Sequence, residues 1–349
     1  MEERIPHSRP TLGQAEADAA AEAVLSGHVA AGERTARFER AVAEFAGRSE
    51  AVATSSGTAA LYAALRALGA GHGGEVIVPS FVCTALLHAV RAAGAEPVVC
   101  DVGDGFNMSA EDARARLTGR TAAVIVPHMF GTPAAIGEIA ELGPPVIEDC
   151  AQAIGADIGG AKCGSFGAAS IFSFYATKML ATGEGGMLAS NSPGLVERAR
   201  GLIEYDKKRD AAQRFNLKFN DIAAAVGLVQ LERLGEFIAR RRALAAIYDE
   251  ALAGAPGIKP APAPGSIYYR YVIETDDAPG LIAGLRAQGI AAARPVDPPL
   301  HRIAGGPACP NADRAWKCAV SLPIYPSLPA AQAGAAAAAA AAAAFERLR

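Results

Sequence analysis

The stretch from Ile171 to Met187 reads IFSFYATKMLATGEGGM and places Lys178 between an aromatic run and a cluster of three glycines. The aromatic run is typical of a buried strand, and the glycines predict a turn. Because burial of an unpaired ammonium costs a large free energy, this lysine is either a surface residue whose charged end reaches water or a reactive amine. The residues around it decide between the two.

The bulk composition limits what the chain can be. Its 349 residues are 51% hydrophobic, which is enough for a large core and about two domains. A net charge of -3 gives no electrostatic reason to expect nucleic acid or an anionic membrane as a partner. Six scattered cysteines without a Cys-x-x-Cys pair support neither a disulfide framework nor a zinc site. The polar start MEERIPHSRP and the lack of a membrane-spanning run predict a cytoplasmic protein.

Short apolar runs alternate with alanine-rich helical stretches in the first half of the chain. An apolar run without alternation is typical of a strand covered on both faces, and helices between such strands predict a mostly parallel sheet. The fold class is therefore predicted to be α/β. The runs are EVIVPSF (75–81), EPVVCDV (96–102), AAVIVPHMF (122–130) and PPVIEDC (144–150).

The second half predicts a smaller α+β domain. Apolar residues recur at helical spacing from Ile222 to Leu252, which predicts one or two long helices. A Pro/Gly-rich loop follows, and IYYRYVIET (267–275) is then predicted to be a strand. We place the boundary near residue 235, with a large domain over 1–235 and a small domain over 236–349.

Two features of this half are predicted to be purely structural. The ten alanines Ala335–Ala344 favour a terminal helix, docked by Leu328 and Phe345. The three consecutive arginines at 240–242 are predicted to lie on a solvated helix face.

Two glycine-rich segments resemble nucleotide motifs but lack their context. GAGHGG (69–74) fits G-x-G-x-x-G, yet it follows a helical pattern and precedes a strand, the reverse of the dinucleotide fingerprint. It is predicted to be a helix C-cap and turn. TGEGG (182–186) has its lysine before the glycines, so it is not a Walker A loop.

Polar residues gather where predicted strands end, which is where α/β sheets bind ligands. Residues 55–58 (Ser-Ser-Gly-Thr) begin an amphipathic helix whose free amides could hold an anion, although an ordinary N-cap explains them equally. Glu148 and Asp149 end a strand, and a buried carboxylate needs a cationic partner. An amine, a carboxylate and a phosphate cradle are what pyridoxal 5'-phosphate (PLP) requires for its Schiff base, ring nitrogen and phosphate.

Seven segments resemble, in this order, the DegT/StrS family of sugar aminotransferases. They are SSGTAAL, EVIVPSF, IEDCAQAIGA, GSFG...SIFSFYATK, GEGGM, RFNLKFNDIAAAVGLVQLERL and SLPIYPSL. The resemblance covers nearly the whole chain, and an ordered set of seven motifs is highly specific. It implies a fold type I PLP enzyme that acts as a homodimer, with each active site completed by the partner chain.

The resemblance also assigns roles to residues. Lys178 forms the Schiff base with PLP, and Asp149 partners the pyridine nitrogen. The other implied cofactor contacts are Gly57, Thr58 and Ala59 at the phosphate, Gln152 near the ring hydroxyl, Ser173, Asn216 reaching the other subunit's phosphate, and Lys218 as a second such contact. His301 matches a position near the substrate and His128 ends a strand, but a structural role explains either histidine equally.

The sequence also departs from the family pattern. Cys83 stands where the family usually has an aromatic residue that stacks on the PLP ring. The segment IEYDKKRDAAQ (203–213) replaces a common family loop, and its Lys207, Lys208 and Arg209 could grip a diphosphate, although a solvated loop explains the same charges.

The function predicted from these residues is transfer of an amino group from glutamate, or from glutamine, to a nucleotide-linked keto sugar. The alternatives are a ketocyclitol aminotransferase, a PLP-binding regulatory protein without turnover, and a sugar dehydratase. Lys178 together with Asp149 favours catalysis over regulation. Histidine replaces the lysine in the family's dehydratase branch, so Lys178 also favours transamination.

Overall fold

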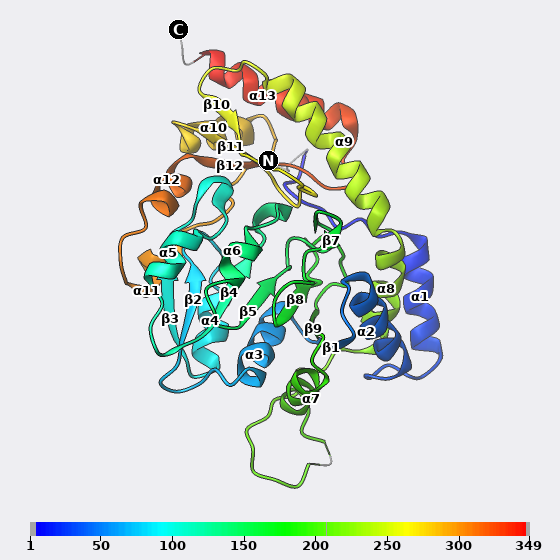
Figure 1. Cartoon of the computed structure of the whole chain (residues 1–349). Helices are drawn as coiled ribbons and strands as arrows, with labels where there is room; N and C mark the ends of the chain where they lie inside the picture. The colour runs from blue at the N-terminus through cyan, green and yellow to red at the C-terminus, as the bar shows by residue number, and fades with distance from the viewer. Residues whose placement is uncertain (1–4, 207, 347–349) are drawn as a thin grey trace.

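The computed structural model describes residues 5–206 and 208–346, arranged around one seven-stranded sheet (Figure 1). The strand order is β1-β9-β8-β5-β4-β2-β3. Strands β8, β5, β4, β2 and β3 are parallel, whereas β9 runs antiparallel to both β8 and β1. The bounds are β1 (Glu50–Thr54), β2 (Glu75–Pro79), β3 (Glu96–Cys100), β4 (Thr121–Pro127), β5 (Val146–Asp149), β8 (Ala169–Ser173) and β9 (Gly186–Ser190). The α/β prediction is confirmed, and all four predicted runs contain strands.

Helices cover both faces of this sheet, which explains why its strands are apolar without alternation. Ile125 packs in the core under α3 (Gly57–Ala67), α4 (Ala85–Ala92) and α7 (Pro193–Leu202). The neighbouring Val124 packs on the opposite face, which α5 (Ala110–Ala115) and α6 (Ile136–Ala140) cover. Further along that face lie α2 (Glu33–Phe45) and α8 (Asp221–Glu232), and α1 (Gln14–Leu25) packs on α8.

A three-stranded antiparallel sheet carries the second core. It consists of β10 (Ile258–Pro260), β11 (Tyr271–Thr275) and β12 (Ala319–Leu322), covered by α9 (Leu234–Leu252), α10 (Ala278–Ala287) and α13 (Ala330–Glu346). Helices α8 and α9 are the long helices predicted after Asp221. Ile5 joins this second core and hydrogen-bonds to Gly289 and Ala291, so the start of the chain packs with its far end. The domain boundary near residue 235 stays a prediction.

Short elements complete the described chain. They are η1 (Asp104–Phe106), η2 (Met129–Gly131), β6 (Asp157–Ile158), β7 (Ala161–Lys162), α11 (Leu300–Ala304) and α12 (Pro310–Cys318). GAGHGG is a helix cap and turn, as predicted: Gly69 has φ +91° and donates to the carbonyl of Arg66 before β2 begins. Among the described helices, none combines the length and hydropathy needed to cross a membrane.

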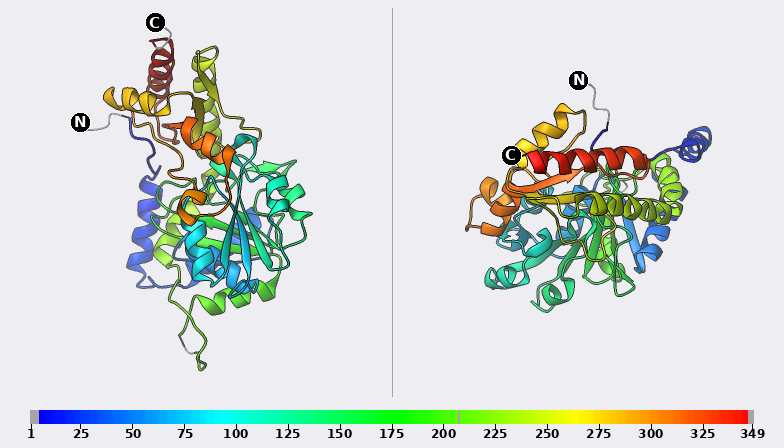
Figure 2. Two further views of the ribbon diagram at one scale, coloured as in Figure 1. Left: turned by 90° about the vertical axis from the view of Figure 1, so that its left-hand side faces the viewer. Right: turned by 90° about the horizontal axis from the view of Figure 1, so that it is seen from above.

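The alanine tract forms a helix, but the prediction that Phe345 docks it is wrong. Figures 1 and 2 show α13 lying along α9. The buried face of α13 is made of Ala333, Ala336, Ala337, Ala340 and Ala344, which follow helical spacing. Phe345 lies one position beyond that face, a turn of about 100°, and is 54% exposed. Leu328, just before the helix, is buried as predicted.

The prediction that the three arginines of α9 lie on a solvated face is wrong for Arg241, whereas Arg242 is exposed as predicted. Arg241 is only 3% exposed, and its Nη1 donates to the carbonyl oxygens of Tyr268, Tyr269 and Ile324. Its two neighbours also bind carbonyls, Arg240 that of Leu328 and Arg242 that of Ser266. The prediction failed because irregular segments fold back over α9 and need donors for their carbonyl groups.

A close backbone contact fixes the start of α3 against the sheet. A Cβ on Gly186, the first residue of β9, would lie 2.3 Å from the carbonyl oxygen of Ser56 and 2.5 Å from the amide of Gly57. No side chain can occupy this space because both neighbours are backbone atoms. Glycine at 186 therefore lets β9 pass directly beneath the first turn of α3.

We predict that Gly186→Ala will destabilise the protein by about 3 kcal/mol or more, the upper range for overpacking, because a backbone clash cannot be relieved by a change of rotamer. Thermal unfolding would measure the loss. Gly201→Ala is the matched control: a Cβ there meets nothing within 4 Å, and alanine favours α7 by about 0.5–1 kcal/mol. Equal thermal midpoints for the two variants would contradict the prediction.

Candidate active site

A cavity of about 240 Å³ opens where β5 and β8 end and α3 begins. Asp149 enters it from the end of β5 and Ser173 from the end of β8. Lys178 reaches it from the loop after β8, and Thr58 from the first turn of α3. Four residues singled out in the sequence thus meet in one cavity, at the carboxyl ends of the parallel strands.

The start of α3 offers free donors to this cavity. The hydroxyl of Ser56 caps the helix by accepting from the amide of Ala59 at 3.1 Å, so the predicted phosphate contact of Ala59 through its amide is already occupied. The amides of Gly57 and Thr58 have no acceptor among the described residues. The side chain of Ser173 lies close by, with Oγ 3.2 Å from where a Cβ on Gly57 would be. Two free amides, a hydroxyl and the helix dipole suit an anion.

Asp149 and Lys178 face the cavity without pairing with each other. Asp149 Oδ1 accepts from the amide of Ala151 at 2.9 Å, whereas Oδ2 has no donor in the described chain. Burial raises the pKa of Asp149, although the Ala151 amide and the charge of Lys178 oppose this. The amine of Lys178 has neither an acid partner nor a hydrogen-bond acceptor among the described residues. A cationic ligand group beside Oδ2 would relieve the cost of burying this carboxylate.

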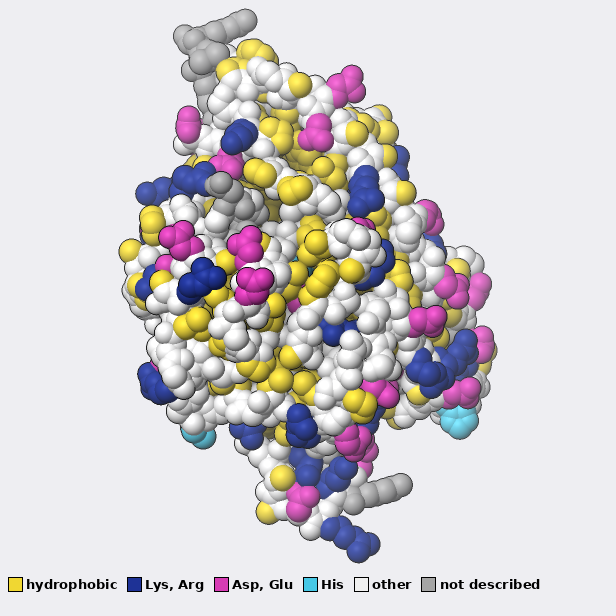
Figure 3. Space-filling model, viewed as in Figure 1, with side chains coloured by type: hydrophobic (Ala, Val, Ile, Leu, Met, Phe, Trp, Pro, Cys, Tyr) yellow, Lys and Arg dark blue, Asp and Glu magenta, His cyan; other side chains and the backbone are white. Residues whose placement is uncertain are grey.

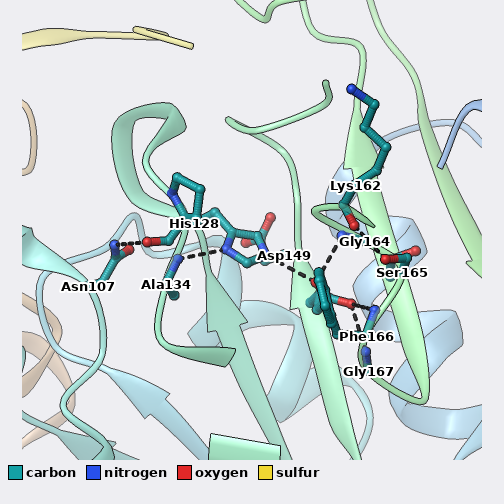
Figure 4. A network of polar contacts seen from close by, with 12 residues as sticks. Asn107, His128, Ala134, Asp149, Lys162, Gly164, Ser165, Phe166 and Gly167 are labelled. Carbon is teal, nitrogen blue, oxygen red and sulfur yellow. Dashed lines mark hydrogen bonds and ion pairs between the residues drawn. The ribbon is translucent and has the colours of Figure 1, made fainter. Parts of the chain in front are cut away.

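The preceding carboxylate, Glu148, is fully buried and fully satisfied. Figure 4 labels four of its partners, His128, Gly164, Phe166 and Gly167. Its Oε1 accepts from the amides of Phe166 and Gly167, each at 2.7 Å, and its Oε2 accepts from the amide of Gly164 at 2.8 Å. Arg48 adds an ion pair at 3.3 Å. Burial would raise the pKa of Glu148, but hydrogen bonds from His128 and these amides outweigh it and lower the pKa. Glu148 is therefore a charged structural anchor at the end of β5.

His128, which follows β4, belongs to the same network. Its Nδ1 accepts from the amide of Ala134 at 3.0 Å, so its proton is on Nε2, which contacts Glu148 at 3.2 Å. Ligand atoms of His128, Glu148 and Cys150 lie within 4.8 Å of one another, a spacing that a metal ion could use. The hydrogen bonds already occupy the histidine and carboxylate atoms, so the cluster is a structural network. His128 thus takes the structural role.

Of Cys83 and Gln152, which the sequence also singled out, only Cys83 is among the lining residues of the cavity. Loss of water around the sulfur and the negative charge of Asp149 raise the pKa of the Cys83 thiol, so the thiol is neutral near pH 7. The side chain of Gln152 binds the backbone instead, since its Oε1 accepts from the amide of Phe130 at 2.8 Å. This bond holds Phe130 in a left-handed conformation with φ +59°.

The remaining predicted residues do not reach this chain's cavity. Asn216 is exposed, and Lys218 forms an ion pair with Asp206 that raises the pKa of the lysine. Lys208 and Arg209 are exposed on the loop that projects beyond α7 (Figure 1), and Lys207 lies outside the described residues.

His301 also lies apart from the cavity lining. Its Nδ1 is 2.6 Å from Ser80 Oγ and its Nε2 is 3.2 Å from Asp313 Oδ1, so it ties α11 to the end of β2 and to α12.

Three residues near Lys178 were missed in the sequence. Tyr175 and Glu184 line the cavity on either side of Lys178 in the chain, and their closeness to the lysine was the available signal. Tyr269 places its ring 5.0 Å from the amine of Lys178. No sequence pattern connects Tyr269 with Lys178, because Tyr269 belongs to the segment before β11, far along the chain from the lysine.

Comparison with known proteins gives consistent matches over most of the chain. The pattern of the DegT/DnrJ/EryC1/StrS aminotransferase family matches residues 10–339. The dTDP-4-dehydro-2,3,6-trideoxy-D-glucose 4-aminotransferase of Saccharopolyspora spinosa is 35% identical over 357 residues, covering 93% of this chain and 92% of that protein. The GDP-perosamine synthase of Vibrio cholerae is 35% identical over 263 residues, 72% of each protein. The crystal structure of the aminotransferase TlmJ from Streptoalloteichus hindustanus has a TM-score of 0.93 and 34% identity, covering 99% of this chain and 100% of that one.

We predict that Asp149→Asn will stabilise the cofactor-free protein near neutral pH. Burial raises the folded pKa of this carboxyl above its ordinary 3.8, so the folded state penalises the carboxylate at every pH above the folded pKa. An amide carries no such penalty. The gain should disappear as the pH falls below 3.8, because Asp149 is then protonated in both states. Thermal unfolding midpoints across this pH range would measure it.

Glu148→Gln is the matched comparison, and its effect should have the opposite sign. The pKa of Glu148 is lowered in the fold, so its carboxylate contributes stability above the ordinary 4.5 and loses it as the pH falls through the folded pKa. Glutamine would turn an NH₂ group toward donors and leave Arg48 buried without its partner, a loss of about 3–5 kcal/mol. A destabilising Asp149→Asn would contradict the account of the cavity.

Proposed function

This chain belongs to the DegT/DnrJ/EryC1/StrS aminotransferase family, and from that premise we propose that its cavity aminates a nucleotide-linked keto sugar with glutamate as the amino donor. The chain is a PLP-dependent sugar aminotransferase. What we propose beyond this is the role of each cavity residue, glutamate as the amino donor and a nucleotide on the acceptor sugar. The observation that carries it is that one cavity holds both the amine of Lys178, which has no acid partner, and a carboxylate oxygen of Asp149 that has no donor among the described residues.

The residues of the cavity fit PLP. The free amides of Gly57 and Thr58 and the hydroxyl of Ser173 suit its phosphate, and Asp149 Oδ2 suits a protonated ring nitrogen. Lys178 supplies the amine that holds the cofactor covalently. When bound, PLP supplies an aldehyde that condenses with amines and a protonated ring that accepts electrons.

Lys178 carries the proton in the proposed reaction. After the donor amine displaces it, its Nζ is a free base that removes the proton from the donor α-carbon. The same amine then returns a proton during the transfer to the acceptor. No acid of the described chain pairs with this amine, so no salt bridge with a carboxylate has to be broken when a base is needed.

Asp149 keeps a proton on the ring nitrogen in this proposal. Its carboxylate is buried, and a buried carboxylate attracts a neighbouring cation more strongly than an exposed one, because the local dielectric constant is lower. The neighbouring Glu148 network fixes the end of β5, so the carboxylate is held in place before the cofactor binds.

The acceptor is proposed to be a keto sugar on a nucleoside diphosphate. The two curated relatives act on dTDP- and GDP-linked sugars by their names, which supports this class. Basic side chains gather at the lower end of Figure 3, where α7 and its projecting loop lie. Lys208 and Arg209 do not line this chain's cavity, so they would meet the diphosphate at the cavity of a partner chain.

We also propose a homodimer with shared active sites. The loop that carries Asn216 projects from the body of the molecule (Figures 1 and 2) and exposes apolar side chains, with Tyr205 55% and Phe215 44% exposed. Exposed apolar residues on a projecting loop suit a protein interface. Docked on a second copy, this loop would bring Asn216 toward the partner's phosphate site.

The proposed location is the cytoplasm. All six cysteines carry free thiols, and four of them are buried. Exported proteins of this cysteine content commonly form disulfides, whereas a reducing compartment keeps the thiols free.

We predict that the PLP-loaded protein will be yellow, that glutamate will bleach the colour, and that a nucleotide-linked keto sugar will restore it. Absorbance spectra with a panel of nucleotide keto sugars and ketoinositols would measure this, with glutamine compared as donor. Lys178→Ala should abolish the colour change, and the Lys208→Ala/Arg209→Ala variant should mainly raise the apparent Michaelis constant for the sugar. Restoration by a ketoinositol alone would replace the sugar acceptor with a cyclitol.

We predict that mixing Lys178→Ala chains with Asn216→Ala chains will recover activity that neither variant has alone. In the hybrid dimer one cavity would combine an intact lysine with an intact asparagine from the partner. Activity after verified subunit exchange would measure this, with each variant incubated alone as the control. No recovery in exchanged dimers would show that each chain builds its own site.

A further inference from the structure

The ring of Tyr269 lies beside the amine of Lys178. The ring centroid is 5.0 Å from Nζ, and Tyr269 is only 6% exposed. No carboxylate among the described residues forms an ion pair with Lys178, and its Nζ has no hydrogen-bond acceptor there. The ring is therefore the group that contacts the charge of the lysine, through a cation–π interaction.

The backbone around Tyr269 is fixed from the large sheet. Ile267 donates to the carbonyl of Gly131 at 3.0 Å, and Arg270 donates to the carbonyl of Phe130 at 3.3 Å. A Cβ on Gly131 would lie 2.9 Å from the amide of Tyr269, and φ is +88° at this glycine. Only glycine permits this approach, so the turn after β4 sets the position of the ring relative to the cavity.

The hydroxyl of Tyr269 contacts the residue before the lysine. Thr177 Oγ1 is 3.4 Å from it, and Arg270 Nη2 donates to it at 3.4 Å. The guanidinium of Arg270 also lies 4.7 Å from the ring centroid. The tyrosine thus contacts both Lys178 and Arg270, and two protein segments orient its hydroxyl.

A neutral histidine holds Arg270 in turn. Arg270 Nη1 lies 3.1 Å from His7 Nδ1, and because arginine only donates, the imidazole proton is on Nε2, 2.9 Å from Ser321 Oγ. Burial and the charge of Arg270 lower the pKa of His7 to about 3. His7 therefore stays neutral at any pH at which the protein works.

Positive charges surround the phenol. Burial would raise the pKa of Tyr269, but Lys178 after β8, Arg270 in its own segment and Arg241 on α9 outweigh burial and lower the pKa to about 8. The other titratable side chains that line the cavity with the lysine are Asp149, Cys83, Tyr175 and Glu184. Among all these groups, the phenol of Tyr269 alone both touches the lysine and changes charge just above neutral pH.

We propose that Tyr269 is a positioning residue for Lys178. Its ring holds the amine beside the cavity, and its ring and hydroxyl together raise the proton affinity of that amine. The inference rests on the proposed role of Lys178 as the proton carrier. The ring face stabilises the ammonium, and a phenolate formed near pH 8 stabilises it further. A proton carrier must also be held within reach of the proton that it moves, and the ring keeps Nζ in one place beside the cavity.

The test measures the lysine directly in cofactor-free protein. Acylation of Lys178 by a small amine reagent, followed by mass spectrometry of its peptide, gives the pH midpoint of the free amine. In Tyr269→Leu the midpoint should fall by about half to one pH unit, the worth of a lost cation–π contact. Tyr269→Phe keeps the ring, so its profile should depart from wild type only above about pH 8, where labelling should be faster because no phenolate forms.

Tyr268→Phe is the matched control, one residue away. Burial and Asp249 raise the pKa of Tyr268, while Arg242 opposes them, and Lys178 has no part in this shift. Its loss should leave the Lys178 profile unchanged. Phenolate absorbance should show one group that titrates near pH 8 in wild type and in Tyr268→Phe but not in Tyr269→Phe.

Wild-type labelling profiles in folded Tyr269→Leu and Tyr269→Phe would overturn the inference. If Tyr269→Leu does not fold, Tyr269→Phe decides alone, since an unchanged profile above pH 8 excludes the phenolate effect. In loaded enzyme, Tyr269→Leu should slow the glutamate half-reaction on the order of tenfold with little change in the Michaelis constant. An active Lys178→Ala would refute the proposed function itself. If Lys178→Ala is inactive but the Tyr269 variants behave like the wild type, only this inference is refuted.

Discussion

The buried carboxylate of Glu148 is the interaction on which the rest of the site depends. Three backbone amides, Arg48 and His128 all converge on it, and they come from the loop before β8, the end of α2 and the end of β4. Removing this charge would leave several donors buried without partners at once. Because Asp149 follows directly on β5, the same network fixes where the next carboxylate enters the cavity.

Adjacent carboxylates therefore have opposite environments. Glu148 is surrounded by donors that lower its pKa, whereas Asp149 has a single amide donor, and burial raises its pKa. The first stabilises the fold, and the second is an unfavourable charge until a cation binds beside it. Alternation along one strand produces this difference, since successive side chains point to opposite faces of the sheet. Stability and ligand binding are thus assigned to neighbouring residues.

Sequence patterns predicted what depends on local order, and they missed what depends on distant packing. Strand runs and the residues near their ends predicted Asp149, Lys178 and the start of α3, because parallel strands bring their carboxyl ends together, whereas Ser173 came from the family resemblance. Burial of Arg241 depends on carbonyls of segments folded back over α9, which helical spacing cannot show. Cavity residues from a second copy are also invisible in one chain, so the role of Asn216 stays a prediction.

The contact between Tyr269 and Lys178 depends on segments from the whole length of the chain. The segment before β11 supplies the ring, the turn after β4 supplies the glycine that admits it, and the N-terminal segment supplies the histidine that orients Arg270. Phe130 and Tyr268, which flank this contact, both have positive φ, a conformation that costs free energy and persists only where surrounding contacts impose it. Any displacement of the three-stranded sheet would move the ring away from Lys178. The electrostatic surroundings of the lysine therefore depend on how the two cores pack, and not on its own loop alone.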